Sequence, residues 1–205
     1  MAPARTKETE TRRGTGLGAR VDQAVSRLSS VVSELDPDRL TGADATSLYR
    51  ALAGAERLVL AGKALLAPRI EDSGVWKDAG HRDAASLLAA VEGVSPGQAR
   101  RTLAVGQRLG ALPGTEEVLR RGELSGPKVG ALTGAGIIDP TREGELLEGA
   151  TDEPLALVEE RCLRARAAAA EADPTAATRV IHAGRRFSSW TDAEGAFCYQ
   201  GRDTA

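Results

Sequence analysis

The chain has 205 residues, enough to bury a hydrophobic core, and its composition favours helices over sheets. Aromatic residues make up only 3% of the chain, and the apolar fraction of 41% is mostly Ala, Leu and Val. A net charge of -2 with a pI near 5.8 excludes a surface that binds nucleic acid all over, so any contact with DNA must be a local patch.

The sequence predicts a cytoplasmic protein without a bound metal or cofactor. No apolar run is long enough for a membrane span, and the polar N-terminus lacks the apolar core of a signal peptide. Cys162 and Cys198 show no metal-type spacing, which fits a reducing compartment, although a single disulfide between them stays open.

The sequence predicts that residues 1–20 form a disordered tail and that residues 21–176 form one helical domain. Apolar residues recur at alternating intervals of four and three residues from Val21 to Leu35. The same spacing returns from Leu48 to Leu66, after an expected helix cap at Asp44. We expect the two helices to pack together as a hairpin, and Pro68 to kink or end the second. The alternative is a homodimer through the Leu48 to Leu66 helix, although a coiled coil needs this pattern over more heptads.

The stretch 83–109 predicts a helix-turn-helix. A short helix over 83–92 has apolar residues at helical spacing (Ala84, Leu87, Leu88 and Val91), and Gly93 can adopt the left-handed conformation that ends it. Ser95 and Gln98 then form a capping-box pattern with Pro96 at the first helical position. In the second helix, Ala99, Leu103 and Gly106 are expected to pack on the first.

The opposite side of the second helix carries Arg101 and Arg108, with Gln98 and Arg100 on its flanks. In a DNA-binding helix-turn-helix the N-terminal part of this helix enters the major groove, where arginine bonds to guanine or to phosphate. The candidate DNA-binding residues here are Ser95, Gln98, Arg100, Arg101 and Arg108. A solvated face of a helical bundle explains the same pattern, and both interpretations stay open.

Further basic residues follow the helix-turn-helix, and the last part of the chain changes character. Arg120, Arg121 and Lys128 lie near expected helices at 115–121 and after Ser125, and they are candidates for contact with phosphates. Pro140 and Pro154 are each expected to open a helix, and the second of these helices would bury Cys162. Residues 178–205 predict a β-hairpin that begins a truncated segment.

An ordered series of motifs resembles a known family. The motifs are Ala55-Glu56-Arg57-Leu58, Gly62-Lys63-Ala64, Gly80-His81-Arg82-Asp83, Gly93-Val94-Ser95, Leu112-Pro113, Gly122-Glu123-Leu124-Ser125 and Trp190-Thr191-Asp192. From about residue 40 to the end, the chain resembles an actinobacterial repeat family in which a domain of unknown function precedes an HNH endonuclease domain. The stretch from Gly93 to Leu132 is more loosely similar to the helix-turn-helix of ParB-type DNA-partition proteins, which supports DNA binding by analogy.

The resemblance implies a nuclease module that this chain does not show. An HNH site needs a histidine base and metal ligands, whereas this chain has two histidines, His81 and His182, far apart, and no CxxC pair. We therefore interpret the chain as the non-catalytic, DNA-targeting part of an HNH-endonuclease-like protein. The alternative is a helical oligomerisation or protein-interaction scaffold without DNA binding. An enzyme acting alone comes third, because Glu143, Glu145 and Glu148 are typical of a solvated helix face.

Overall fold

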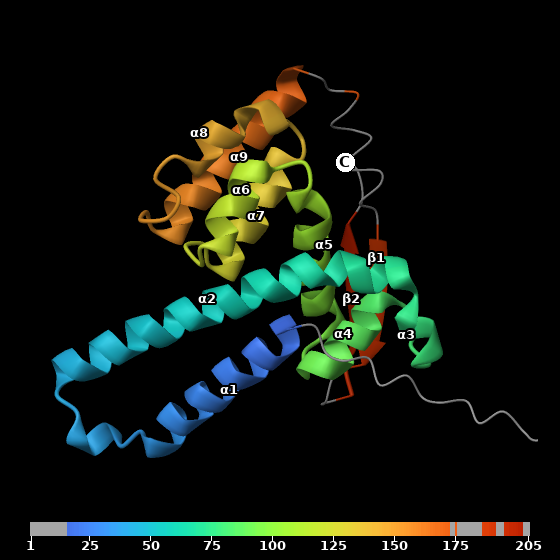
Figure 1. Ribbon diagram of the computed structural model, residues 1–205. Coiled ribbons are helices and arrows are strands. Elements are labelled where there is room, and N and C mark those ends of the chain that lie inside the picture. The colour runs from blue at the N-terminus through green and yellow to red at the C-terminus, as the bar shows by residue number, and fades with distance from the viewer. Residues whose placement is uncertain (1–15, 173–174, 176–185, 192–194, 203–205) are drawn as a thin grey trace, which may run out of the picture. The chain divides into compact units, whose positions relative to one another are not determined.

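The computed structural model describes residues 16–172, 175, 186–191 and 195–202, and within them the chain is mainly helical, as predicted (Figure 1). The chain divides into two compact units, residues 1–50 and residues 51–205. This division falls inside the range 21–176 that the sequence predicts as one helical domain. None of the helices in the described ranges is both long and apolar enough to cross a lipid bilayer.

The first unit consists of α1 (Gly16–Glu34), the 3-10 helix η1 (Pro37–Arg39) and the first turns of α2 (Gly42–Ser73). α1 begins at Gly16, earlier than the predicted Val21. Asp36 separates it from η1, and the Asp36 carboxylate accepts a hydrogen bond from the Asp38 amide at 3.1 Å. No residue of α1 is buried, so its regular apolar seam stays exposed.

α2 differs from its prediction at both ends. Its cap is Thr41, whose hydroxyl accepts a hydrogen bond from the Asp44 amide at 3.2 Å, rather than Asp44 itself. Pro68 does not end the helix, which continues to Ser73. A proline inside a helix costs a hydrogen bond and crowds the preceding turn, and here the Pro68 ring lies close to Gly106 of α5.

A small core, cluster A, lies where α2, α4 (Ala84–Glu92) and α5 (Pro96–Leu109) meet. It consists of Ala67, Ala84, Ala85, Leu88, Ala89, Ala99 and Leu103. Trp76, in the short α3 (Val75–Asp78), packs against this cluster at the predicted junction, and its indole nitrogen donates to the Glu71 carbonyl at 3.3 Å. Because most of these residues are alanines, the helices can approach closely.

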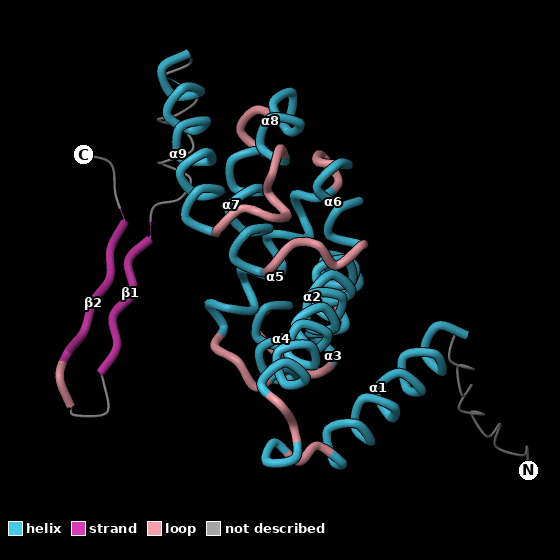
Figure 2. The backbone as a smooth tube through the Cα atoms, turned by 90° about the vertical axis from the view of Figure 1, so that its left-hand side faces the viewer, coloured by secondary structure: helices cyan, strands magenta, loops and turns pink. Residues whose placement is uncertain are grey.

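A larger core, cluster B, joins α2 and α5 to α6 (Pro113–Arg120), α7 (Gly126–Gly136), α8 (Glu143–Leu147) and α9 (Leu155–Ala172), with η2 (Pro140–Arg142) before α8 (Figure 2). α7 buries five of its eleven residues, among them Val129, Leu132 and Thr133. The Thr133 hydroxyl donates to the Val129 carbonyl at 2.8 Å, so burial leaves it with a hydrogen bond. α7 is therefore the central helix of this core.

Pro140 and Pro154 stand at helix starts, as predicted: Pro140 is the first residue of η2, and Pro154 immediately precedes α9. α9 buries Val158 and Cys162. Burial raises the pKa of the Cys162 thiol, as expected for a cysteine that acts as a small hydrophobic residue.

Near the C-terminus, β1 (Arg186–Thr191) and β2 (Phe197–Arg202) pair antiparallel. Arg186 lies opposite Arg202, and Thr191 lies opposite Phe197. Residues 178–185, which include His182, and residues 192–194 and 203–205 fall outside the described residues. That this hairpin begins a further segment stays a prediction.

Candidate nucleic-acid interface

The helix-turn-helix predicted at 83–109 is present, and its local signals act as expected. The Asp83 carboxylate caps α4 by accepting hydrogen bonds from the amide and the hydroxyl of Ser86, at 2.7 and 2.5 Å. Gly93 ends α4 with a left-handed φ of 68°. The Ser95 hydroxyl accepts a hydrogen bond from the Gln98 amide at 3.2 Å and so caps α5. These contacts fix the turn between the two helices.

The buried face of α4 is rotated relative to the prediction. Ala84 and Leu88 are buried as expected, but Val91 is 75% exposed. Ala85 and Ala89 take the buried positions instead. The apolar spacing identified a helix with one buried side, but α4 is apolar on too much of its surface for spacing alone to locate that side.

α5 packs against two helices rather than one. Ala99 and Leu103 join α4 in cluster A, as predicted. Gly106 was expected on the same contact, but it faces α2: a Cβ added to Gly106 would lie 2.1 Å from the Ala64 carbonyl oxygen. The absence of a side chain at Gly106 therefore lets the backbones of α5 and α2 come together.

The start of α5 presents its predicted DNA-binding residues to solvent. Ser95, Gln98, Arg100 and Arg101 are exposed, whereas Arg108 is half-buried beside Gly134 of α7. Among the described residues, the Arg101 guanidinium has no hydrogen bond or ion pair. Arg101 is thus a positive charge available to an external anion.

One carboxylate lies near this surface. Asp83 is 3.4 Å from the Arg82 guanidinium and 3.9 Å from that of Arg100. The hydrogen bonds from Ser86 are the main cause that lowers the pKa of Asp83, and the two arginines add to it. The carboxylate is therefore ionised at neutral pH and offsets part of the positive charge at the start of α5.

Arg120, Arg121 and Lys128, the predicted phosphate contacts, have partners within the chain. Arg120 pairs with Glu116 at 2.7 Å. Arg121 pairs with Glu117 and Glu123, and the hydrogen bonds that it donates to Glu123 raise the pKa of Arg121. The Lys128 ammonium donates to the Thr151 carbonyl at 3.0 Å. A phosphate would have to compete with these partners, so the positive surplus counted along the sequence is smaller on the folded surface.

The carboxylates of α8 and its neighbours have structural contacts. Glu143 was expected on a solvated face, but its carboxylate accepts hydrogen bonds from the amides of Gly114 and Thr115, at 3.2 and 2.6 Å. Glu143 therefore caps α6, because the residue before this helix, Leu112, has an apolar side chain that cannot accept a hydrogen bond. Glu145 forms an ion pair with Arg142 at 2.8 Å.

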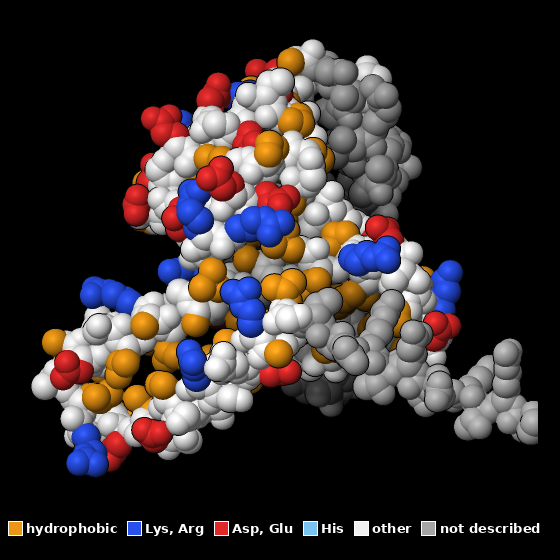
Figure 3. Space-filling model, viewed as in Figure 1, with side chains coloured by type: hydrophobic (Ala, Val, Ile, Leu, Met, Phe, Trp, Pro, Cys, Tyr) orange, Lys and Arg blue, Asp and Glu red, His pale blue; other side chains and the backbone are white. Residues whose placement is uncertain are grey.

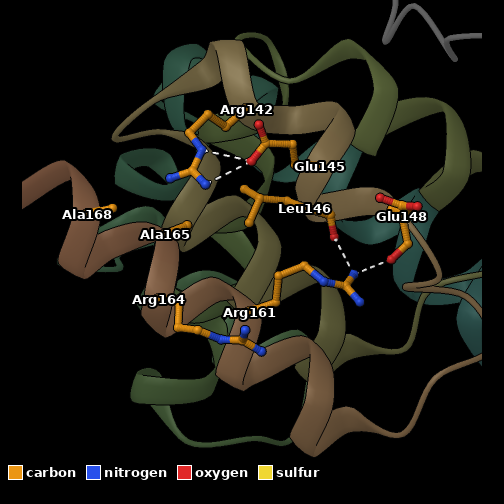
Figure 4. Close-up of a pocket in the computed structure, with 8 residues that line it drawn as sticks. All are labelled: Arg142, Glu145, Leu146, Glu148, Arg161, Arg164, Ala165 and Ala168. Carbon is orange, nitrogen blue, oxygen red and sulfur yellow. Dashed lines mark hydrogen bonds and ion pairs between the residues drawn. The ribbon is translucent and has the colours of Figure 1, made fainter.

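An open hollow of about 460 Å³ lies between α8 and α9 (Figure 4). The Arg161 guanidinium, on its wall, donates to the carbonyls of Leu146 and Glu148 and pairs with Glu153. Arg142 and Arg164 are paired with Glu145 and Glu160. Since all three arginines have internal partners, the hollow offers no free cation to a ligand, and its lining contains no Ser, Thr, Cys, Lys or His.

The described residues contain no cluster of three His, Cys, Asp or Glu side chains that could hold a metal ion. His81 is half-buried at the turn before α4, where its backbone amide donates to the Trp76 carbonyl at 2.9 Å. Its position fits the structural role expected from the sequence. The surface at the start of α5 is therefore the candidate site that this part of the chain offers.

Searches against family models, curated proteins and solved structures found no match to this chain. Any proposal for its function therefore depends on the residues described above.

Sequence reasoning found the helix-turn-helix but missed two contacts that hold it in place. The Lys63 ammonium of α2 pairs with Glu92 at the end of α4. The Gln107 side-chain amide of α5 donates to the Glu71 carboxylate of α2 at 2.5 Å. Neither pair is close in sequence, so no local pattern could have revealed it.

Proposed function

We propose that this chain binds duplex DNA through the start of α5, with Arg101 as its principal contact. The observation that carries the proposal is the exposed, unpaired Arg101 guanidinium on the second helix of a helix-turn-helix. Gln98 and Arg100 flank it and offer further hydrogen-bond donors. The N-terminal part of the second helix is the part of this motif that meets base edges in the major groove.

The other candidates contribute less directly to this proposal. Ser95 already accepts a hydrogen bond from α5, and its hydroxyl proton can still be donated to a phosphate oxygen. Arg108 is half-buried, and Arg120, Arg121 and Lys128 are held by internal partners. We assign these residues to the edge of the interface, where they would add electrostatic attraction without reading bases.

The family resemblance extends the proposal. The chain would be the non-catalytic, cytoplasmic targeting region of an HNH-endonuclease-like protein, and phosphodiester cleavage would belong to a nuclease module elsewhere. Within this proposal the chain needs no metal or cofactor of its own. The C-terminal hairpin would begin the connection towards that module.

Fluorescence anisotropy of a labelled random-sequence duplex, titrated at several salt concentrations, tests the proposal. Binding should weaken as salt increases because phosphate contacts release counterions. Arg101→Ala should weaken it by roughly tenfold and lower the salt slope by about 1. The matched control is Arg164→Ala, which removes the same charge from a side chain that is 72% exposed on α9. Absence of binding at low salt, or equal losses in both variants, would refute the proposal.

A second candidate is a helical oligomerisation or protein-interaction scaffold. The observation that favours it is the exposure of the α2 seam: Val59 is 58% exposed and Leu66 is 61% exposed. A homodimer through the Leu48 to Leu66 helix would cover this seam. In that case Arg101→Ala would have no effect on function, and a seam substitution such as Val59→Lys would dissociate the assembly.

A further inference from the structure

The first unit exposes an apolar face that runs the length of α1. Its members recur at two positions of the first seven-residue repeat and at three positions of the next two, and in the described residues none of them is buried. They are Leu17, Val21, Ala24, Val25, Leu28, Val31, Val32 and, just after the helix, Leu35. The seven Val and Leu residues among them are between 39% and 66% exposed. Figure 3 shows apolar side chains uncovered along the segment that Figure 1 labels α1.

The apolar face of α1 is wide enough to pack against more than one neighbouring helix. A strict two-stranded coiled coil needs two apolar positions per heptad, whereas helices of a bundle use three. The first unit supplies one other helical stretch, the start of α2, where Leu48 is 36% and Tyr49 is 76% exposed. One chain therefore provides fewer helices to this unit than the face of α1 can contact.

The amount of apolar surface matches what a dimer requires. With roughly 150–200 Å² per fully exposed residue, the exposed Val, Leu and Tyr side chains of this unit present on the order of 800 Å², about the contribution of each partner to a standard interface.

The charges of the unit also permit self-association. Residues 16–50 carry four arginines and five carboxylates, so two copies would repel each other little. The charged residues of α1 lie outside its apolar positions, so covering the face places no charge at its centre; they are Arg20, Asp22, Arg27 and Glu34. A DNA backbone, in contrast, would gain nothing from this near-neutral surface.

We propose that the first unit is a homodimerisation module in which the apolar face of α1 packs against the first unit of a second copy of this chain. The face is covered by α1 and the start of α2 from the partner, so that four helical segments share one core. This inference stands apart from DNA binding, because it uses residues 16–50 and the proposed DNA contacts all lie in α5 or beyond.

The test is analytical ultracentrifugation of the full chain over a wide range of concentrations. The wild-type protein should sediment as a monomer–dimer equilibrium. Val25→Lys places a charge in the apolar face and should weaken dimerisation by more than about tenfold. Gln23→Lys adds the same charge to the opposite side of α1 and should leave the dimer unchanged.

Three results would overturn the proposal. A wild-type protein that stays monomeric at all concentrations would show that the face is covered within the chain or by a different partner. A Val25→Lys dimer as strong as the wild-type dimer would place self-association elsewhere, for example on the seam from Leu48 to Leu66. Equal weakening by Gln23→Lys would indicate a general effect of charge. Circular dichroism should show unchanged melting of the second unit in both variants, because no residue of α1 is buried.

Discussion

α1 and α7 show how differently two helices of one chain can be used. α1 has the more regular amphipathic pattern, yet it buries no residue. α7 has no continuous polar side, and it lies at the centre of cluster B with Val129, Leu132 and Thr133 buried. An amphipathic pattern therefore shows that a helix has a face to cover, but it does not show what covers it. The first unit and the second unit differ in the same way, and three predictions test the difference.

The largest effect is expected from removing a buried leucine. Leu132, 1% exposed in α7, is surrounded by cluster B. Leu132→Ala should lower the free energy of unfolding by about 2–5 kcal/mol, because it removes buried methyl groups and leaves a cavity. Leu28→Ala in α1 should change it by less than about 1 kcal/mol, because that residue is 39% exposed. Urea unfolding at low protein concentration measures both, and similar losses would show that the face of α1 is covered within the chain.

A medium effect is expected from two glycine substitutions. Gly106→Ala brings a methyl group to 2.1 Å from the Ala64 carbonyl oxygen, so α5 and α2 must move apart. We expect the free energy of unfolding to fall by about 1–3 kcal/mol, as at other overpacked sites. A Cβ added to Gly18 in α1 would have no atom within 4 Å, so Gly18→Ala should stabilise this helix by up to about 1 kcal/mol. Thermal unfolding followed by circular dichroism distinguishes the two, and a neutral Gly106→Ala would contradict the close approach.

The smallest effect is expected at the helix caps, where pH provides the test. Asp83→Ala should cost about 1 kcal/mol at neutral pH, reduced by the solvent around this partly exposed side chain. Folding lowers the pKa of Asp83, because the hydrogen bonds from Ser86 favour its ionised form. Its stabilisation is therefore complete above the ordinary pKa of an aspartate, and it is lost as the pH falls through the lowered value in the folded state.

The control for this prediction is Asp36→Ala in the first unit, where the cap belongs to a helix of three residues. It should change the stability of the second unit little at any pH. Unfolding curves between neutral and acidic pH measure the difference between wild type and each variant. A difference for Asp83→Ala that does not shrink in acid would contradict the role of the charged cap.

Local signals predicted the helix-turn-helix well. The cap at Ser95 and the left-handed Gly93 depend on hydrogen bonds and backbone angles within a few residues, so the sequence specifies them directly. The same holds for the exposure of Gln98, Arg100 and Arg101, because helical spacing places them away from Ala99 and Leu103.

Long-range contacts explain the predictions that failed. Val91 was expected in the core, but α4 instead buries Ala85 and Ala89 where it meets α5. For Pro68 there were two alternatives, a kink or an end of α2; it does not end α2, which continues to Ser73 with the Pro68 ring close to Gly106 of α5. Glu143 was expected in solvent, and it instead binds two amides of α6 from far along the chain.

The sequence by itself determined the helical class, the turn between α4 and α5 and the set of arginines that are candidates for an interface. These properties follow from backbone propensity, capping and periodicity, which act between residues close in the chain. The tertiary structure decided which arginines are free. Arg121 is neutralised by Glu117 and Glu123, whereas Arg101 has no partner in the described part of the chain. A charge is more available to an external ligand where folding places no opposite charge beside it, and that depends on the packing of distant segments.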